Sequence, residues 1–129
     1  MKDFHSLKVW GKAHALTLAI YKSTAQFPKH ELYSLTNQIQ RAAVSIPANI
    51  AEGCGKDSDA ELKRYFLIAT GSSSELEYLR LLACELGYIS EVNYRSMQND
   101  LVEIRKMLNS FIQKRKAQKA NNGMPPANG

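Results

Sequence analysis

The chain has 129 residues, enough for one domain with its own core but not for two. Its net charge of +5 at pH 7 is moderate, so it permits contact with nucleic acid without requiring it. No run approaches the roughly 18 apolar residues of a membrane span, and the N-terminus has no apolar signal segment. We therefore expect a cytoplasmic protein with no membrane partner.

The first predicted helix covers about residues 6–27. Val9, Ala13 and Ile20 recur on one face at helical spacing. Pro28 ends the helix, because the residue before a proline is disfavoured in the α conformation.

The second predicted helix, within LTNQIQRAAVSIPANIAEGCG at residues 35–55, carries a polar stripe beside its apolar one. The polar stripe consists of Gln38, Arg41, Ser45, Asn49 and Glu52. Amides, a hydroxyl and one residue of each charge at three-and-four spacing favour a specified polar contact over a solvated flank, which is the alternative. These residues are our candidates for an oligomer interface.

Pro47 lies inside this second helix. Its missing N–H and its ring crowding the carbonyl of Ala43 predict a kink there, and two shorter helices meeting at Ser45 are the alternative. Gly53 and Gly55 are expected to supply a left-handed helix end.

The third helix is predicted to start at Ser58, which forms a capping box with Glu61, and to close at Gly87. Gly71 in its middle costs about 1 kcal/mol against alanine, so a packing reason is expected. Ser90 caps the fourth helix, whose apolar stripe ends near residue 116.

Amphipathic helices without any strand pattern predict an all-α fold. We expect an antiparallel up-down-up-down four-helix bundle over residues 1–116, with its second helix kinked at Pro47. Residues 117–129 have the composition of a disordered C-terminal tail.

No pattern of catalytic or metal-binding residues stands out. His5, His14 and His30 all precede the second helix, and none stands three residues after a glutamate as a di-metal bundle site requires. Cys54 and Cys84 match no metal or redox spacing. We expect a protein that is not an enzyme and has neither a cofactor nor a metal.

Basic charge gathers near the C-terminus. After Glu103 the chain has no acidic side chain. The nucleic-acid-binding candidates that follow are Arg105, Lys106, Lys114, Arg115 and Lys116. Such clusters neutralise phosphates and release counterions. The alternative is a solvated helix end that complements the helix dipole.

Three segments carry a family resemblance: LKVWGKAHAL, FPKHELYSLTNQIQRAAVSIPANIAEGCGK and FLIATGSSSELEYLRLLACELGYI. They resemble the four-helix-bundle proteins encoded in intervening sequences of bacterial ribosomal RNA genes. The resemblance implies a homopentamer around a central channel. It also implies similarity to the accessory proteins of diversity-generating retroelements, which are basic pentamers that bind a reverse transcriptase and nucleic acid.

The sequence thus predicts a non-enzymatic homo-oligomeric scaffold that binds structured RNA, or DNA, through clustered Lys and Arg. The alternative is a protein-interaction module that docks a partner protein, such as a reverse transcriptase by resemblance, without touching nucleic acid.

Overall fold

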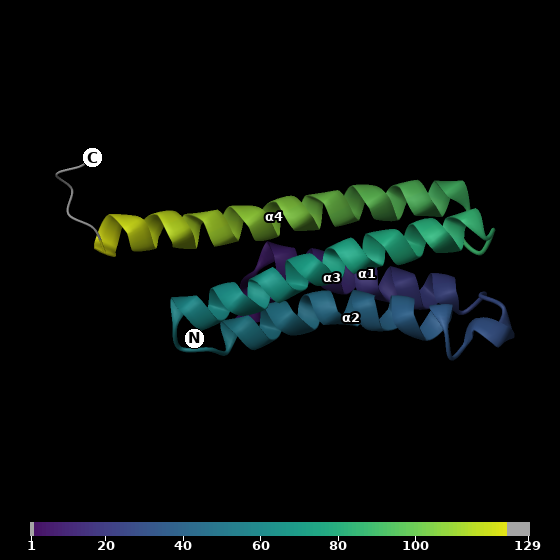
Figure 1. Cartoon of the computed structure of the whole chain (residues 1–129), viewed down its shortest axis with the longest axis horizontal. Helices are drawn as coiled ribbons and strands as arrows, with labels where there is room; N and C mark the ends of the chain where they lie inside the picture. The colour runs from purple at the N-terminus through teal and green to yellow at the C-terminus, as the bar shows by residue number, and fades with distance from the viewer. Residues whose placement is uncertain (1, 124–129) are drawn as a thin grey trace.

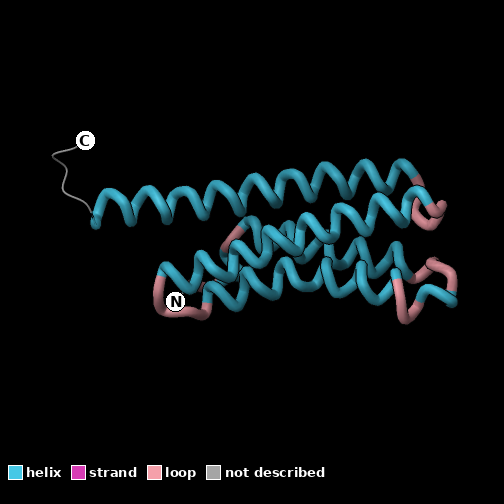
Figure 2. The backbone as a smooth tube through the Cα atoms, viewed as in Figure 1, coloured by secondary structure: helices cyan, strands magenta, loops and turns pink. Residues whose placement is uncertain are grey.

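The computed structural model describes residues 2–123, and for residues 115–123 it describes the backbone alone. Within this part the α-helices are α1 (Lys8–Thr24), α2 (Leu35–Cys54), α3 (Asp59–Glu85) and α4 (Glu91–Gly123). The short 3-10 helices η1 (Phe4–Ser6) and η2 (Lys29–Glu31) precede α1 and α2. Figure 2 shows helices and loops but no strand among these residues.

Consecutive helices run antiparallel, and each of α1 and α3 packs against both α2 and α4 (Figure 1). The predicted all-α four-helix bundle is therefore confirmed. No helix of the described part is both long and apolar enough to be a membrane span.

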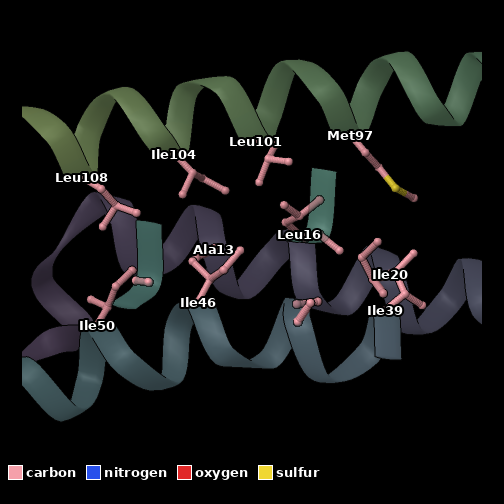
Figure 3. Packing of buried hydrophobic residues seen from close by; sticks show 14 of the residues in the cluster. Ala13, Leu16, Ile20, Ile39, Ile46, Ile50, Met97, Leu101, Ile104 and Leu108 are labelled. Atoms are coloured by element: carbon pink, nitrogen blue, oxygen red, sulfur yellow. The ribbon is translucent and has the colours of Figure 1, made fainter. Parts of the chain in front are cut away.

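The core fills the space between the helices along the length of the bundle. Figure 3 shows the side chains that α1, α2 and α4 send into it, including Ala13, Leu16, Ile20, Ile39, Ile46, Ile50, Met97, Leu101, Ile104 and Leu108. From α3 come Leu62, Phe66, Ala69 and Leu76, among others. Each fully buried Leu, Ile or Phe contributes about 1.5–3 kcal/mol, so burial of these stripes is the main favourable contribution to folding.

One continuous helix passes through Pro47, so the alternative of two helices meeting at Ser45 is wrong. The predicted kink stays a prediction. Pro47 has no N–H to donate to the carbonyl of Ala43, one turn earlier. The hydroxyl of Thr17 on α1 replaces this missing donor. Its Oγ1 lies 3.1 Å from the Ala43 oxygen and 2.9 Å from the Ala13 oxygen. A neighbouring helix thus satisfies the carbonyl that the proline leaves open.

The predicted N-caps Ser58 and Ser90 are confirmed, although the Glu61 carboxylate bonds Arg64 instead of completing the capping box. Ser58 Oγ accepts a hydrogen bond from the Glu61 N–H at 3.1 Å, and Ser90 Oγ accepts one from the Asn93 N–H at 3.2 Å. Gly87, with φ +81°, follows the end of α3 as expected.

The left-handed helix end expected from Gly53 and Gly55 is wrong. Gly55 has φ −81°, and among the described residues a positive φ occurs only at Gly87. Gly53 is needed for space, because a Cβ there would lie 3.0 Å from Tyr65 Cβ and 3.2 Å from the Leu62 oxygen. A Cβ on Gly71 would meet nothing within 4 Å, so no packing inside the chain requires a glycine there.

The backbone of α4 remains helical to Gly123, beyond the boundary at residue 116 expected from the apolar stripe. Figure 1 shows α4 extending past the ends of the other helices. Of the predicted disordered tail, residues 124–129 lie outside the described part, and its disorder stays a prediction.

Replacing Thr17 with Val keeps the shape of the side chain and removes the hydroxyl. We expect Thr17→Val to lower the free energy of unfolding by about 1–3 kcal/mol, because the Ala43 carbonyl is left buried without a donor. Chemical denaturation measures the change. Thr70→Val is the matched control, since among the described residues Thr70 Oγ1 bonds only the Phe66 carbonyl on its own helix, at 3.0 Å. Equal losses of stability in both variants would contradict a special role for Thr17.

Candidate functional site

The N-terminal part of the predicted polar stripe, from Gln38 to Ser45, borders a groove between α2 and α3. The groove encloses about 390 Å³ and is lined by Asn37, Gln38, Arg41, Ala42, Ser45, Ser72 and Glu75. Gln38 and Arg41 are exposed, and neither makes a side-chain hydrogen bond or ion pair with another described residue. We name this feature the α2–α3 groove. It offers uncommitted donors and acceptors on a fixed scaffold.

The rest of the stripe is occupied within the chain. Ser45 Oγ lies 2.7 Å from Ser72 Oγ on α3, and Asn49 Nδ2 donates to the Ser45 carbonyl at 2.7 Å and to Ser45 Oγ at 2.9 Å. Glu52 is exposed, with Oε1 3.9 Å from Lys56 Nζ. Of the five interface candidates, Gln38 and Arg41 are therefore the ones with free hydrogen-bonding capacity at the groove.

The lining suggests what the α2–α3 groove can bind. Arg41 and Glu75 bring charges of opposite sign, while Gln38 and Asn37 both donate and accept hydrogen bonds. Such a mixed lining suits the side chains and peptide groups of another protein surface better than a phosphate, which Glu75 repels. Within the described residues, no group of three or more His, Cys, Asp and Glu is placed to hold a metal ion.

The nucleic-acid candidates on α4 divide into two kinds. Arg105 turns toward α3, where Nη2 lies 2.9 Å from Glu77 Oε1 and Nε donates to Ser73 Oγ at 3.2 Å. Lys106 and Lys114 are exposed. The side chains of Arg115 and Lys116 lie outside the described part. Arg105 thus stabilises the α3–α4 contact, and the available positive charge begins with Lys106.

Sequence reasoning missed a buried arginine beside Arg105. Arg80 is 0% exposed, and its guanidinium donates from Nη1 to Gln98 Oε1 at 2.9 Å and from Nη2 to the Tyr94 carbonyl. Burial lowers the pKa of Arg80, while the Tyr94 ring and the Glu77 carboxylate act in the opposite direction. The spacing held a signal, since Arg80 stands four residues after Leu76 and three before Ala83 on the apolar stripe.

Glu77 connects the two arginines. Its Oε2 accepts a hydrogen bond from Gln98 Nε2 at 2.7 Å, and its Oε1 faces Arg105. The hydrogen bond from Gln98 lowers the pKa of Glu77, and Arg105 lowers it further. We call the set Ser73, Glu77, Arg80, Gln98 and Arg105 the α3–α4 polar network. It joins the two helices through charge-assisted hydrogen bonds.

The molecule is therefore an antiparallel helical bundle with a polar groove on one side and basic side chains along its longest helix. Residues 5–110 match the family described as 23S rRNA-intervening sequence protein. The chain belongs to this family. The predicted similarity to retroelement accessory proteins stays a prediction.

A solved structure of similar fold is a protein of unknown function from the S23 ribosomal protein family of Bacteroides thetaiotaomicron. It is 30% identical in sequence with a TM-score of 0.75, and the match covers 81% of this chain and 97% of that one. No curated protein matches the chain.

The α3–α4 polar network predicts a stability that depends on pH. Because the folded pKa of Glu77 is lowered, its stabilising effect is complete above the unfolded pKa of about 4.3 and is lost as pH falls through the lower folded value. Glu77→Gln should lower the free energy of unfolding at pH 7 by about 1 kcal/mol, since the ion pair with Arg105 is lost and the acceptor of the bond from Gln98 loses its charge.

Urea denaturation across pH measures this effect. The difference between native protein and Glu77→Gln should shrink as pH falls below about 4.3. Glu85→Gln, at an exposed site with no ion pair to a described residue, is the control and should change stability by less than about 0.5 kcal/mol. A destabilisation by Glu77→Gln that is the same at pH 7 and pH 3 would contradict a role for the charge.

Proposed function

We propose that this protein is a non-enzymatic homo-oligomeric scaffold that binds structured RNA through basic side chains on α4. The supporting observation is the stretch after Glu103, which has no acidic residue and lies, as far as Gly123, on a helix that extends beyond the rest of the bundle (Figure 1). A projecting basic helix without acidic side chains attracts phosphates and has no carboxylate that repels them. Lys106 and Lys114 start this surface, and Arg115 and Lys116 continue it in sequence. Counterion release then supplies the affinity.

The family description refers to the intervening sequence of 23S rRNA in which such proteins are encoded, so the choice of RNA as partner rests on the basic charge of α4. DNA shares the phosphate chemistry and is the comparison ligand. By resemblance, the assembly is expected to be a pentamer. A ring would present several α4 ends together, and simultaneous contact raises the overall affinity well above that of one end.

Contact between copies is proposed to use the α2–α3 groove. Gln38 and Arg41 have hydrogen-bonding capacity that the bundle itself does not use, and Glu75 on the opposite wall supplies an acceptor. A neighbouring copy that donates to Glu75 and accepts from Arg41 satisfies both walls. Glu52, exposed farther along α2, extends the same face.

RNA binding is tested by the mobility of a structured RNA hairpin across a salt series. The double reversal Lys106→Glu and Lys114→Glu should weaken binding and reduce the slope of log affinity against log salt by about 0.7–0.9 for each phosphate that the protein no longer neutralises. The matched control is Lys22→Glu with Lys29→Glu, two exposed lysines at the other end of the bundle, which changes the net charge equally. Equal weakening by both pairs, or binding that ignores salt, would contradict an α4 site.

Assembly is tested by light scattering of the native protein and of Arg41→Ala combined with Gln38→Ala. The native protein should have the mass of an oligomer. In the variant, the protein concentration at which half of the oligomer has dissociated should rise about tenfold, because two hydrogen-bonding side chains of the interface are removed. Arg95→Ala is the control, since Arg95 is exposed and pairs only with Glu91 on its own helix. A monomeric native protein would refute the assembly.

A second candidate function, docking of a partner protein, has its own supporting observation. The outward face of α3 leaves four large apolar side chains exposed, namely Leu67, Ile68, Tyr78 and Leu81 at 50, 40, 61 and 40%. Gly71 lies along the same helix with open space at its Cβ position, so another helix can approach closely there. Docking as the main function predicts that partner capture survives the reversal of Lys106 and Lys114 and that the RNA hairpin does not bind.

A further inference from the structure

Four aromatic rings contact one another where the chain enters α1. The rings of Phe4 and His5 are stacked with centroids 4.1 Å apart, and Trp10 contacts both, at 4.9 Å from Phe4 and 5.4 Å from His5. On the other side, His14 lies nearly parallel to Trp10, with centroids 4.9 Å apart and 9° between the planes. We call Phe4, His5, Trp10 and His14 the ring stack.

The ring stack has an anchored inner part and an exposed outer part. Phe4 and Trp10 are half-buried against the hydrophobic core, whereas the His5 side chain is 67% exposed and His14 is also exposed. Packing of the core needs the first two rings but not the imidazoles. The outer π surfaces are thus available to a ligand.

Hydrogen bonds hold the segment before α1 in place. The Lys2 N–H donates to the Cys54 carbonyl at the end of α2, at 2.9 Å. Asp3 Oδ1 accepts from the His5 N–H at 3.1 Å and lies 2.9 Å from His5 Nδ1, and these bonds lower the pKa of Asp3. Ligand binding therefore loses little conformational entropy at the ring stack, because the rings are already positioned.

The surroundings of the ring stack favour a nucleotide. In an up-down-up-down bundle α1 begins at the end where α4 finishes, and Figure 1 shows the start of α1 and the projecting end of α4 on the same side of the molecule. Lys8 is exposed at the start of α1, and Lys12 is paired with Glu103 on α4 at 3.2 Å. Asp3 repels a phosphate placed directly on His5. The stack suits the uncharged base, and the basic residues of α4 at the same end of the bundle suit phosphates farther along the same RNA.

We propose that the ring stack binds an unpaired nucleobase of the RNA by stacking. This inference rests on the proposed RNA binding and adds a preference for loops, bulges or single strands. Every base presents a π face, so stacking on aromatic side chains selects unpaired bases without selecting a sequence. Paired bases in a duplex keep their faces covered by their neighbours. The basic end of α4 supplies affinity for any RNA, and the ring stack distinguishes unpaired from paired RNA.

Trp10 is the single tryptophan of the chain and reports directly on the ring stack. The native protein is titrated with a single-stranded RNA oligonucleotide and with a blunt duplex of the same sequence. Trp10 fluorescence is recorded together with the anisotropy of the labelled RNA. The single strand should quench Trp10 and bind more tightly, whereas the duplex should bind with little change in fluorescence.

The double variant His5→Ala with His14→Ala should weaken single-strand binding about tenfold, in line with the loss of a stacked base, and leave duplex binding unchanged. His30→Ala is the matched control, since its imidazole is 74% exposed and lies in η2 at the other end of the bundle. Both exposed imidazoles can be removed without cutting into the core.

Failure of the stacking inference is distinct from failure of RNA binding. Single-stranded RNA that binds by anisotropy, leaves Trp10 fluorescence unchanged and tolerates the double variant overturns the ring stack as a site and leaves the α4 surface standing. Absence of binding by every RNA overturns both.

Discussion

A buried guanidinium constrains how α3 and α4 fit together. Arg80 is 0% exposed, so its charge must find acceptors inside the protein. Two acceptors come from α4, namely Gln98 Oε1 and the Tyr94 carbonyl. Gln98 in turn donates a hydrogen bond to the Glu77 carboxylate, whose negative charge balances the guanidinium. A shift of α4 by one turn removes these acceptors and leaves the charge unsatisfied. Apolar stripes alone tolerate such a shift far better, so the α3–α4 polar network specifies the register.

The register of α4 has consequences for function. It orients Arg105 into the network and leaves Lys106 and Lys114 exposed, so one basic helix both stabilises the bundle and offers charge to a ligand. It also determines how far the end of α4 reaches beyond the other helices, on the side of the molecule where α1 starts (Figure 1). The basic surface and the ring stack thus lie at the same end, while the α2–α3 groove lies on the side of the bundle and is left for contact with another protein.

The sequence predicted the features that depend on local spacing. Helical periodicity defined the apolar stripes, and Ser58 and Ser90 showed where two helices begin. Periodicity cannot tell which of two glycines meets a neighbouring helix, and here Gly53 does and Gly71 does not. Nor does it connect Thr17 with the carbonyl of Ala43, 26 residues away, which is the contact that lets α2 continue through a proline. The candidate site was predicted only in part, because spacing along one helix does not show which side chains a neighbouring helix occupies. The side chains of Gln38 and Arg41 make no hydrogen bond or ion pair with another described residue, whereas the inward orientation of Arg105 follows from Ser73 and Glu77 on another helix.

Hydrogen exchange with mass spectrometry, on the native protein with and without single-stranded RNA, tests most directly whether the fold gathers the proposed RNA-binding features at one end. Bound RNA should slow amide exchange in peptides that cover residues 2–14 and the C-terminal part of α4, and it should leave the outward faces of α2 and α3 unchanged. Slower exchange confined to α2 and α3, or no change at RNA concentrations that saturate binding, would contradict this arrangement.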